Sequence, residues 1–279
     1  MIEKLKAILK ISRPVNIIIT FVSVIVAAVI CLPGKIPETN VLLAAISAAL
    51  TAASGNIIND FFDIEIDKVN RPIRPLPSGK ITINEARVLI IVLAILSLVL
   101  SFLISYAAFI IVFISNVLLF LYSKLLKGIP LVGNITVAFL TGLVFIFGGV
   151  VVGNLSAAII PAVFAFLINL IREVVKDMQD IEGDEKSNII TFPIKYGFKR
   201  SKLLTLLITF TLILCTLFPF VTQIYRIEYF VIVMVIVNPI LVYCMKILFD
   251  DHSLKNLNRI SNLLKLNMVF GLVAVFLGV

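Results

Sequence analysis

The chain has 279 residues, of which 61% are hydrophobic, and its mean hydropathy is +1.14. A soluble domain would not carry this composition, and several apolar runs approach or reach the length of about 18 residues that a membrane-spanning helix needs. The three cysteines lie far apart and the single histidine has no neighbour at metal-ligand spacing, which argues against a disulfide framework and a zinc site.

Nine apolar stretches are predicted to span the membrane, which makes the chain an all-α, polytopic membrane protein with one transmembrane domain over 1–279. Their approximate ranges are 14–31, 41–60, 84–105, 107–126, 131–152, 156–176, 202–222, 227–248 and 261–279. Only the region around Ser105–Ala108 divides the third span from the fourth, so a tight hairpin is expected there.

The basic residues predict how the spans are oriented. An odd number of spans places the two termini on opposite sides of the membrane. Of the 24 Lys and Arg residues, only Lys35 and Arg226 fall outside the N-terminal segment, the connections after even-numbered spans and the adjoining span ends. Because basic residues accumulate in cytoplasmic loops, the N-terminus is predicted to be cytoplasmic and the C-terminus outside. The net charge of +8 follows from this bias, so no nucleic-acid partner is expected.

Acidic residues are concentrated in two segments that share the same spacing of aspartates. Ten of the sixteen Asp and Glu residues lie within 60–67 or 173–185, and the spacing i, i+3, i+7 occurs in both segments, 117 residues apart. The two triplets are Asp60, Asp63 and Asp67, and Asp177, Asp180 and Asp184. On a helix this spacing places three carboxylates on one face. We expect each of the long loops 61–83 and 177–201 to hold a short interfacial helix that carries the aspartates, and we expect an internal repeat of four, four and one spans.

Carboxylates at a membrane boundary are costly unless cations neutralise them, so the two triplets are predicted to bind metal ions. The spacing lacks the alternating ligands of a calcium-binding EF-hand loop. Mg²⁺ suits it better, because this ion takes one or two carboxylates, keeps several waters and is usually completed by substrate phosphates.

Basic and tyrosine side chains near both triplets are candidates for binding a diphosphate. They are Arg71, Arg74 and Lys80 after the first triplet, Arg172, Lys176 and Lys186 around the second, and Tyr122, Lys124 and Lys127 at the end of the fourth span. Arg offers planar bidentate contacts to phosphate oxygens, and Lys a mobile point charge. Charge develops on the leaving oxygens when a diphosphate departs, and metal ions and cations stabilise it. An allylic isoprenyl diphosphate from the bilayer fits a charged mouth over a dry, apolar helical bundle.

The motifs resemble those of the UbiA superfamily of intramembrane prenyltransferases. The run Asn59-Asp60-x-x-Asp63-x-x-x-Asp67, followed by Asn70-Arg71-Pro72 and Pro75-Leu76-Pro77-Ser78-Gly79, is similar to the first family signature. The segment from Asp177 to Asp184, followed by Thr191-Phe192-Pro193-Ile194-Lys195-Tyr196-Gly197, is similar to the second. Tyr122-Ser123-x-x-x-Lys127 resembles the family's tyrosine–lysine motif, and Ser12-Arg13-Pro14 with Asn16 resembles its opening before the first span.

The resemblance implies nine helices around a central cavity, with Mg²⁺ bridging both motifs to the diphosphate of an isoprenyl donor. The implied metal ligands are Asn59, Asp63, Asp67, Asp177, Asp180 and Asp184, with Asp60 in support of the first set. The implied catalytic residues, which hold or polarise the diphosphate, are Arg71, Tyr122, Lys127 and Lys186. Further substrate-binding candidates are Arg13, Asn16, Arg74, Lys124, Asn134, Asn169, Arg172 and Lys176. The loop doubles an arginine–proline pair, as Arg71-Pro72 and Arg74-Pro75, so either arginine could occupy the family's arginine position.

Within the superfamily the resemblance is to archaeal members that transfer a geranylgeranyl group from its diphosphate to the free hydroxyl of geranylgeranylglyceryl phosphate, a lipid acceptor. One alternative is a prenyltransferase with an aromatic acceptor, for quinone or haem side chains. A non-enzymatic alternative is a secondary transporter, since buried polar residues such as Asn116 and internal repeats are common there. Apart from membrane lipids, no feature of the sequence indicates a macromolecular partner or an oligomeric state.

Overall fold

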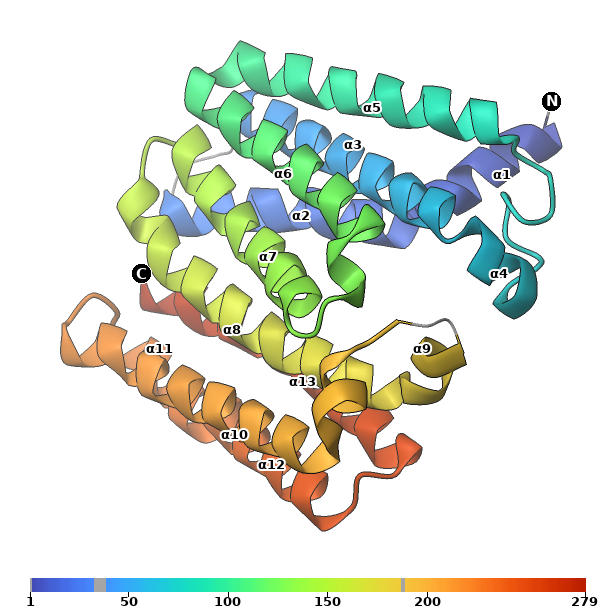
Figure 1. The fold of residues 1–279 in the computed structure, drawn as a ribbon. Helices are drawn as coiled ribbons and strands as arrows, with labels where there is room; N and C mark the ends of the chain where they lie inside the picture. Colours follow the sequence, from blue (N-terminus) through green and yellow to red (C-terminus); the bar gives the residue numbers. More distant parts are fainter. Residues whose placement is uncertain (1, 33–38, 187–188) are drawn as a thin grey trace. The chain divides into compact units, whose positions relative to one another are not determined.

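The apolar stretches form α-helices, as expected for segments that must satisfy their own backbone hydrogen bonds in lipid. A computed structural model describes residues 2–32, 39–186 and 189–279, and none of these residues belongs to a β-strand (Figure 1). The all-α prediction is therefore confirmed.

Nine helical segments in the described residues are long and apolar enough to cross a membrane, as predicted. They are α2 (Pro14–Cys31), α3 (Thr39–Phe62), α5 (Ile83–Ile104), α6 (Tyr106–Lys124), α7 (Val132–Val151), α8 (Leu155–Gln179), α10 (Phe192–Val221), the segment Ile227–Asp250, and α13 (Leu254–Gly278). Segment Ile227–Asp250 consists of α11 (Ile227–Ile232), a π-helical stretch (Val233–Val237) and α12 (Asn238–Asp250). The remaining helices are α1 (Ile2–Ser12), α4 (Ile64–Asn70), α9 (Ile181–Lys186) and a 3₁₀ turn (Leu126–Gly128).

Two spans begin earlier than the sequence predicted. The helix α10 begins at Phe192 rather than near 202, and α13 begins at Leu254 rather than near 261. Gly197 interrupts the regular geometry of α10 with a positive φ of 80°, a conformation that glycine adopts at no steric cost. The extra turns of α13 carry Lys and Asn side chains, so hydropathy alone placed its start too late.

The hairpin between the third and fourth spans is confirmed, and it turns at a single residue, Ser105. Ser105 has extended backbone angles (φ −169°, ψ 161°) and lies between the last residue of α5 and the first of α6. Its hydroxyl accepts a hydrogen bond from the backbone N–H of Ala108 at 3.1 Å. A serine in this N-cap position satisfies an N–H group that the first turn of a helix leaves unpaired.

The chain divides into two compact units. One comprises residues 1–126 and 143–158, and the other residues 127–142 and 159–279. In the first unit α3 packs against α2, α5 and α6. Small residues let these helices approach closely, and the core there includes Val24, Ala44, Ala45, Ala108, Val112 and Phe147. The proposed single domain with a repeat of four, four and one spans stays a prediction.

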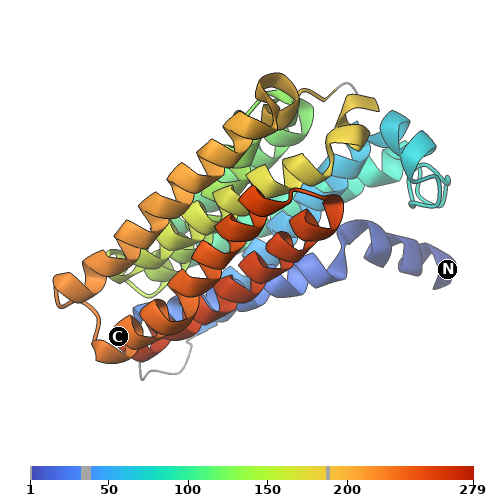
Figure 2. The same cartoon turned by 90° about the horizontal axis from the view of Figure 1, so that it is seen from below.

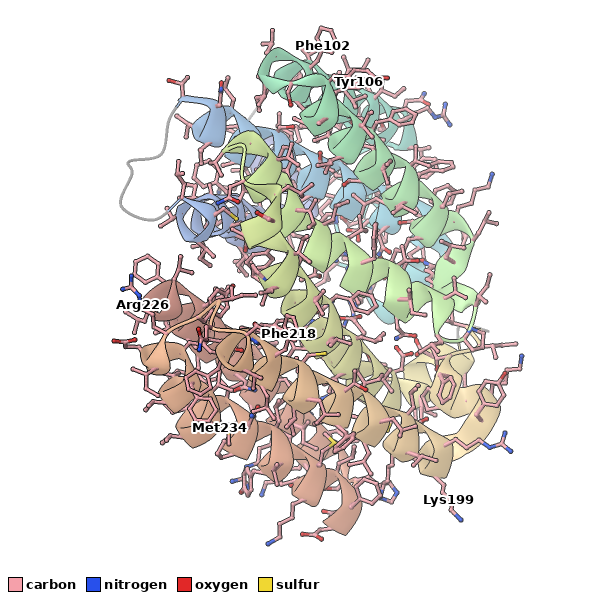
Figure 3. All side chains as sticks on the ribbon, turned by 90° about the vertical axis from the view of Figure 1, so that its left-hand side faces the viewer. Phe102, Tyr106, Lys199, Phe218, Arg226 and Met234 are labelled. Atoms are coloured by element: carbon pink, nitrogen blue, oxygen red, sulfur yellow. The ribbon has the colours of Figure 1, made fainter. Side chains whose placement is uncertain are left out.

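In the second unit α13 packs against α11 and α12, and α12 and α13 lie side by side (Figure 2). Gly278 allows the end of α13 to approach Tyr229, since a Cβ at this glycine would lie 2.4 Å from the tyrosine Cβ. Figure 3 shows Lys199 and Arg226 at opposite ends of this unit, with Phe218 between them. Phe218 is exposed, as expected for a side chain that meets lipid.

Gly148 is a close-packing position that can be tested. A Cβ at Gly148 of α7 would lie 2.6 Å from the Cβ of Ala27 and 2.9 Å from the backbone nitrogen of Ala28, both in α2. Gly148→Ala should lower the free energy of unfolding by about 1–3 kcal/mol, because neither contact can move without shifting backbone. Gly271→Ala is the matched control, because a Cβ there meets no atom within 4 Å. Thermal unfolding in one detergent checks this, and a Gly148→Ala midpoint equal to the wild-type value would contradict it.

Candidate active site

The two aspartate segments share one local structure, which differs from the predicted one. Each span ends at the residue before its middle aspartate, and a short helix follows: α4 after Asp63 and α9 after Asp180 (Figure 1). The expectation that the short helices carry all three aspartates is therefore wrong, because each carries only the third. The backbone hydrogen bonds Asp67 N–H to Asp63 O (2.8 Å) and Asp184 N–H to Asp180 O (2.9 Å) continue across the break.

In the first segment, two arginines lie on buried aspartates. Asp60 is 3% exposed and Asp67 is 5% exposed. Arg13 donates through Nη2 to Oδ1 of Asp60 at 2.5 Å. Arg74 donates through Nη1 to the same Asp60 oxygen at 3.2 Å and to Oδ2 of Asp67 at 2.5 Å. Two predicted substrate-binding residues thus pair with two predicted metal ligands, and the four formal charges sum to zero.

Arg13 reaches Asp60 from an unusual backbone conformation. Its φ of 56° and ψ of 74° place it in the left-handed region, between α1 and α2. This costs an L-residue about 1–2 kcal/mol. The following residue, Pro14, disfavours the right-handed helical region at Arg13 and starts α2. Asn56 of α3 donates to the carbonyl of Ser12 at 2.9 Å, so a second hydrogen bond joins this junction to α3.

The proline-rich loop after α4 is fixed to the same helices. Leu76 and Ile81 are buried in a core that also contains Ala7 and Ile11 of α1, Ile57 of α3 and Ala86 of α5. The loop closes on α5 with a capping box, in which Thr82 accepts from the backbone N–H of Glu85 and the Glu85 carboxylate accepts from the N–H of Thr82. The Thr-x-x-Glu spacing of such a box can be recognised in the sequence.

The structure distinguishes the two arginines of the doubled arginine–proline pair. Arg74 is bound to Asp60 and Asp67, as described. Arg71 is exposed, and no ion pair with another described residue is found for it. In the same segment Asn59 donates through Nδ2 to Oδ2 of Asp63 at 3.0 Å, so the predicted metal ligand Asn59 would have only its amide oxygen to offer an ion.

In the second segment, Asp177 of α8 is oriented by an amide. Asn134 of α7 is 8% exposed and donates through Nδ2 to Oδ2 of Asp177 at 2.9 Å. Asn134 was predicted to bind substrate, and here it contacts a predicted metal ligand.

Two carboxylates of the second segment lie close enough to repel one another. The pKa of Asp184 is raised to about 6, first by partial burial and then by the charge of Asp180. The positive charges of Lys176 and Lys127 oppose this rise. A bound cation would remove the repulsion, and every donor atom in both segments is an oxygen, so the residues present fit a hard ion such as Mg²⁺. Across the described ranges, no three or more His, Cys, Asp or Glu side chains are grouped so that they could hold a metal ion.

Sequence reasoning overlooked Glu173 as a site residue. It is 8% exposed, accepts from Nη1 of Arg172 at 2.9 Å and lies 3.7 Å from Nζ of Lys176. Its place in the acidic segment 173–185 was the available signal. Two buried donors beside it, Nε of Arg172 and Nδ2 of Asn169, have no hydrogen-bond partner among the described residues. Such orphaned donors suit an anionic ligand.

The other predicted residues lie at the surface of their helices or have partners elsewhere. Asn16 and Lys186 are exposed. Lys124 lies over the ring of Phe120, 5.7 Å from its centroid. Tyr122 is half-buried and has an interaction within the protein. The two segments belong to different units. It stays a prediction that they act on one substrate.

Sequence comparison supplies the family. The UbiA prenyltransferase family matches residues 20–269. A digeranylgeranylglyceryl phosphate synthase of Methanocaldococcus jannaschii is 39% identical to this chain, over 99% of the chain and 97% of the synthase. Another, of Methanosphaera stadtmanae, is 35% identical over 97% and 98% of the two chains. The chain belongs to the UbiA prenyltransferase family. It is therefore a prenyltransferase and a multi-pass membrane protein, as the motifs predicted.

Solved structures agree with this assignment. A structure of a digeranylgeranylglyceryl phosphate synthase has a TM-score of 0.88 and 36% identity, and the match covers 99% of this chain and 98% of that one. A UbiA homologue from Archaeoglobus fulgidus, solved with GPP and Mg²⁺ bound, has a TM-score of 0.65 and 19% identity, over 96% and 99% of the chains. The second likeness shows that the fold is shared.

The buried pairing of Asp60 makes a testable difference to stability. Asp60→Ala leaves Arg13 and Arg74 without their shared partner, and it should lower the free energy of unfolding by about 3–5 kcal/mol. Glu65→Ala removes one member of an exposed pair, Lys68–Glu65 at 2.7 Å, and should cost less than about 1 kcal/mol. Thermal unfolding of both variants in one detergent tests this, and equal losses of stability would refute the buried pairing.

Proposed function

We propose that this chain transfers the geranylgeranyl group of geranylgeranyl diphosphate to the free hydroxyl of geranylgeranylglyceryl phosphate and releases diphosphate. The observation that carries the proposal is its identity of 35–39% with digeranylgeranylglyceryl phosphate synthases over nearly the full chain. In this reaction the allylic C1–O bond of the donor breaks, an ether bond forms between C1 and the acceptor oxygen, and the acceptor hydroxyl loses its proton.

Both aspartate segments would hold Mg²⁺ ions. The ligands would be Asn59, Asp63, Asp67, Asp177, Asp180 and Asp184. When bound, Mg²⁺ neutralises charge on the departing diphosphate. The oxygen-only donor set and the repulsion between Asp180 and Asp184 support this proposal. The Mg²⁺ and GPP bound to the homologue from Archaeoglobus fulgidus support it as well.

The cationic side chains would bind the diphosphate. Arg71 is exposed beside the first segment, and Lys127 lies close enough to the second for its charge to lower the pKa of Asp184. Tyr122 and Lys186 would add a hydroxyl and a further cation. The unpaired donors of Arg172 and Asn169 would serve an anionic group near Asp177, and the apolar spans would exclude water from the allylic carbocation.

The relatives favour a lipid acceptor over an aromatic one, since those compared above are synthases of a glyceryl phosphate lipid. The transporter hypothesis loses its basis, because the family is one of prenyltransferases.

A transfer assay on purified protein tests the proposal. Geranylgeranyl diphosphate and Mg²⁺ are supplied with either geranylgeranylglyceryl phosphate or 4-hydroxybenzoate. We expect a diether product with the lipid acceptor, and we expect it to vanish with chelator and in Asp63→Ala and Asp180→Ala. Asp250→Ala, which removes an exposed carboxylate at the end of α12, is the matched control and should retain activity.

The two acceptors separate the hypotheses. Product with 4-hydroxybenzoate alone would keep the prenyltransferase chemistry and overturn the lipid acceptor. Full activity of Asp63→Ala and Asp180→Ala would contradict the role of both segments in metal binding.

We also propose that the N-terminus and both aspartate segments are cytoplasmic and that the C-terminus lies outside. The positive-inside distribution of Lys and Arg supports this orientation. Reporter fusions in cells test it. Green fluorescent protein should fluoresce when fused at the N-terminus, and alkaline phosphatase should be active when fused at the C-terminus. The opposite pattern would contradict the orientation.

A further inference from the structure

Four side chains of the first aspartate segment form a chain of alternating charge. In order they are Arg13, Asp60, Arg74 and Asp67, and the three distances that link them are 2.5, 3.2 and 2.5 Å. Asp60 and Asp67 are buried, and the Arg74 side chain is 19% exposed. A chain of ion pairs at this depth fixes the geometry of every member, because each charge left without its partner would be costly.

Two guanidinium groups hold Asp60. Its Oδ1 atom accepts from both arginines, and the helix carrying it ends two residues later. No hydrogen bond to its Oδ2 atom is found among the described residues, but two positive charges beside one buried carboxylate disfavour a further cation there. Sequence reasoning placed Asp60 among the metal ligands. Its contacts instead make it the link between the junction of α1 with α2 and the loop that carries Arg74.

Asp67 is held by one guanidinium group, whereas Asp60 is held by two. Arg74 donates to Oδ2, and no hydrogen bond to Oδ1 is found among the described residues. A carboxylate held through one oxygen presents the other in a defined direction. Outer partners of this kind orient metal ligands, and their loss typically lowers metal affinity about 10–100-fold.

We propose that Arg13, Asp60 and Arg74 are positioning residues that aim Asp67 at the metal ion, and that Asp60 is not itself a metal ligand. The proposal rests on the proposed function, in which Asp67 binds Mg²⁺. Arg74 holds Asp67, Asp60 holds Arg74, and Arg13 holds Asp60. Arg71 is thereby left as the arginine of the doubled pair that contacts diphosphate.

The scaffold explains how the chain of charges is kept in place. Pro14 and the left-handed conformation fix the backbone of Arg13, and Asn56 binds the carbonyl of Ser12 beside it. On the other side, Leu76 anchors the Arg74 loop in the core between α1 and α3. Both arginines therefore reach Asp60 from rigid backbone.

The test measures metal affinity directly. Purified full-length protein in detergent is titrated with Mn²⁺ in the presence of inorganic diphosphate, and electron paramagnetic resonance counts the free ion. The variants are Arg74→Met, Arg74→Lys, Asp60→Asn and the double variant Asp60→Asn/Arg74→Met. Arg87→Ala, which removes an exposed arginine of α5, is the matched control. The metal dependence of turnover is recorded in parallel.

We expect Arg74→Met and Asp60→Asn each to weaken Mn²⁺ binding about 10–100-fold. The Mn²⁺ affinity of the double variant should be within about 3-fold of that of the weaker-binding single variant, because the effects of residues that act through one another do not add. At saturating metal, kcat should return to within a few-fold of wild type. Arg74→Lys should lie between Arg74→Met and wild type, since one ammonium is a point charge without the fixed fork of a guanidinium.

Two results would overturn the proposal. Wild-type Mn²⁺ affinity in Arg74→Met would show that Arg74 does not position Asp67. Multiplicative losses in the double variant would show that Asp60 acts independently of Arg74, as a direct ligand would. If Arg74→Met does not purify as a folded protein, Arg74→Lys and Asp60→Asn carry the test, and wild-type affinity in both contradicts the proposal.

The wild-type control separates this failure from failure of the proposed function. Wild-type protein that neither binds Mn²⁺ nor transfers a prenyl group contradicts the proposed function itself. Wild-type protein that does both, with variants that bind Mn²⁺ equally well, contradicts only the positioning role.

Discussion

A carboxylate at the end of a membrane-spanning helix must be paired with positive charge or hydrogen-bond donors, because lipid cannot solvate it. In this protein the first aspartate segment meets that requirement with two arginines, which hold Asp60 and Asp67 in buried ion pairs. The second meets it with the amide of Asn134 and the charges of Lys127 and Lys176. The two segments thus neutralise the same spacing of aspartates with different partners. The first is compensated within the protein, and the second keeps a repulsion between Asp180 and Asp184 that a metal ion would relieve.

The common break at Asp63 and Asp180 gives both segments the same geometry. The first aspartate lies in a long span, the second in a turn and the third in a short helix. In the first segment the aspartates before and after the break still meet, because one nitrogen of Arg74 bonds both Asp60 and Asp67.

The nine spans follow from local sequence, and for that reason their existence was predictable, although α10 and α13 begin earlier than hydropathy indicated. Apolar runs of sufficient length gave nine helices, and Ser105 ended one and capped the next. The partners of the aspartates were not predictable in the same way. Arg13 lies 47 residues before Asp60, and only the packing of α1 and α3 brings the two together. The break at each middle aspartate also escaped prediction, because the i, i+3, i+7 spacing is compatible with a continuous helix.

Residue type alone was a poor guide to role within the site. Arg71 and Arg74 have nearly the same sequence context, yet one is exposed and the other lies in the ion-pair chain. Glu173 was overlooked because it precedes the repeated spacing, although it is buried against Arg172. In both cases the role of the charged residue depends on its burial and on its distance from other charges. Neither can be read from the neighbouring residues in the sequence.

The metal sites can be located in a structure with Mn²⁺ and a non-reactive thiolodiphosphate analogue of the donor, since the anomalous signal of manganese marks the ions. We expect ions that contact Asp63 and Asp67 on one side and aspartates of the second segment on the other, with Arg74 still bound to Asp67. Ions confined to one segment, or ions bound through Asp60, would contradict this expectation.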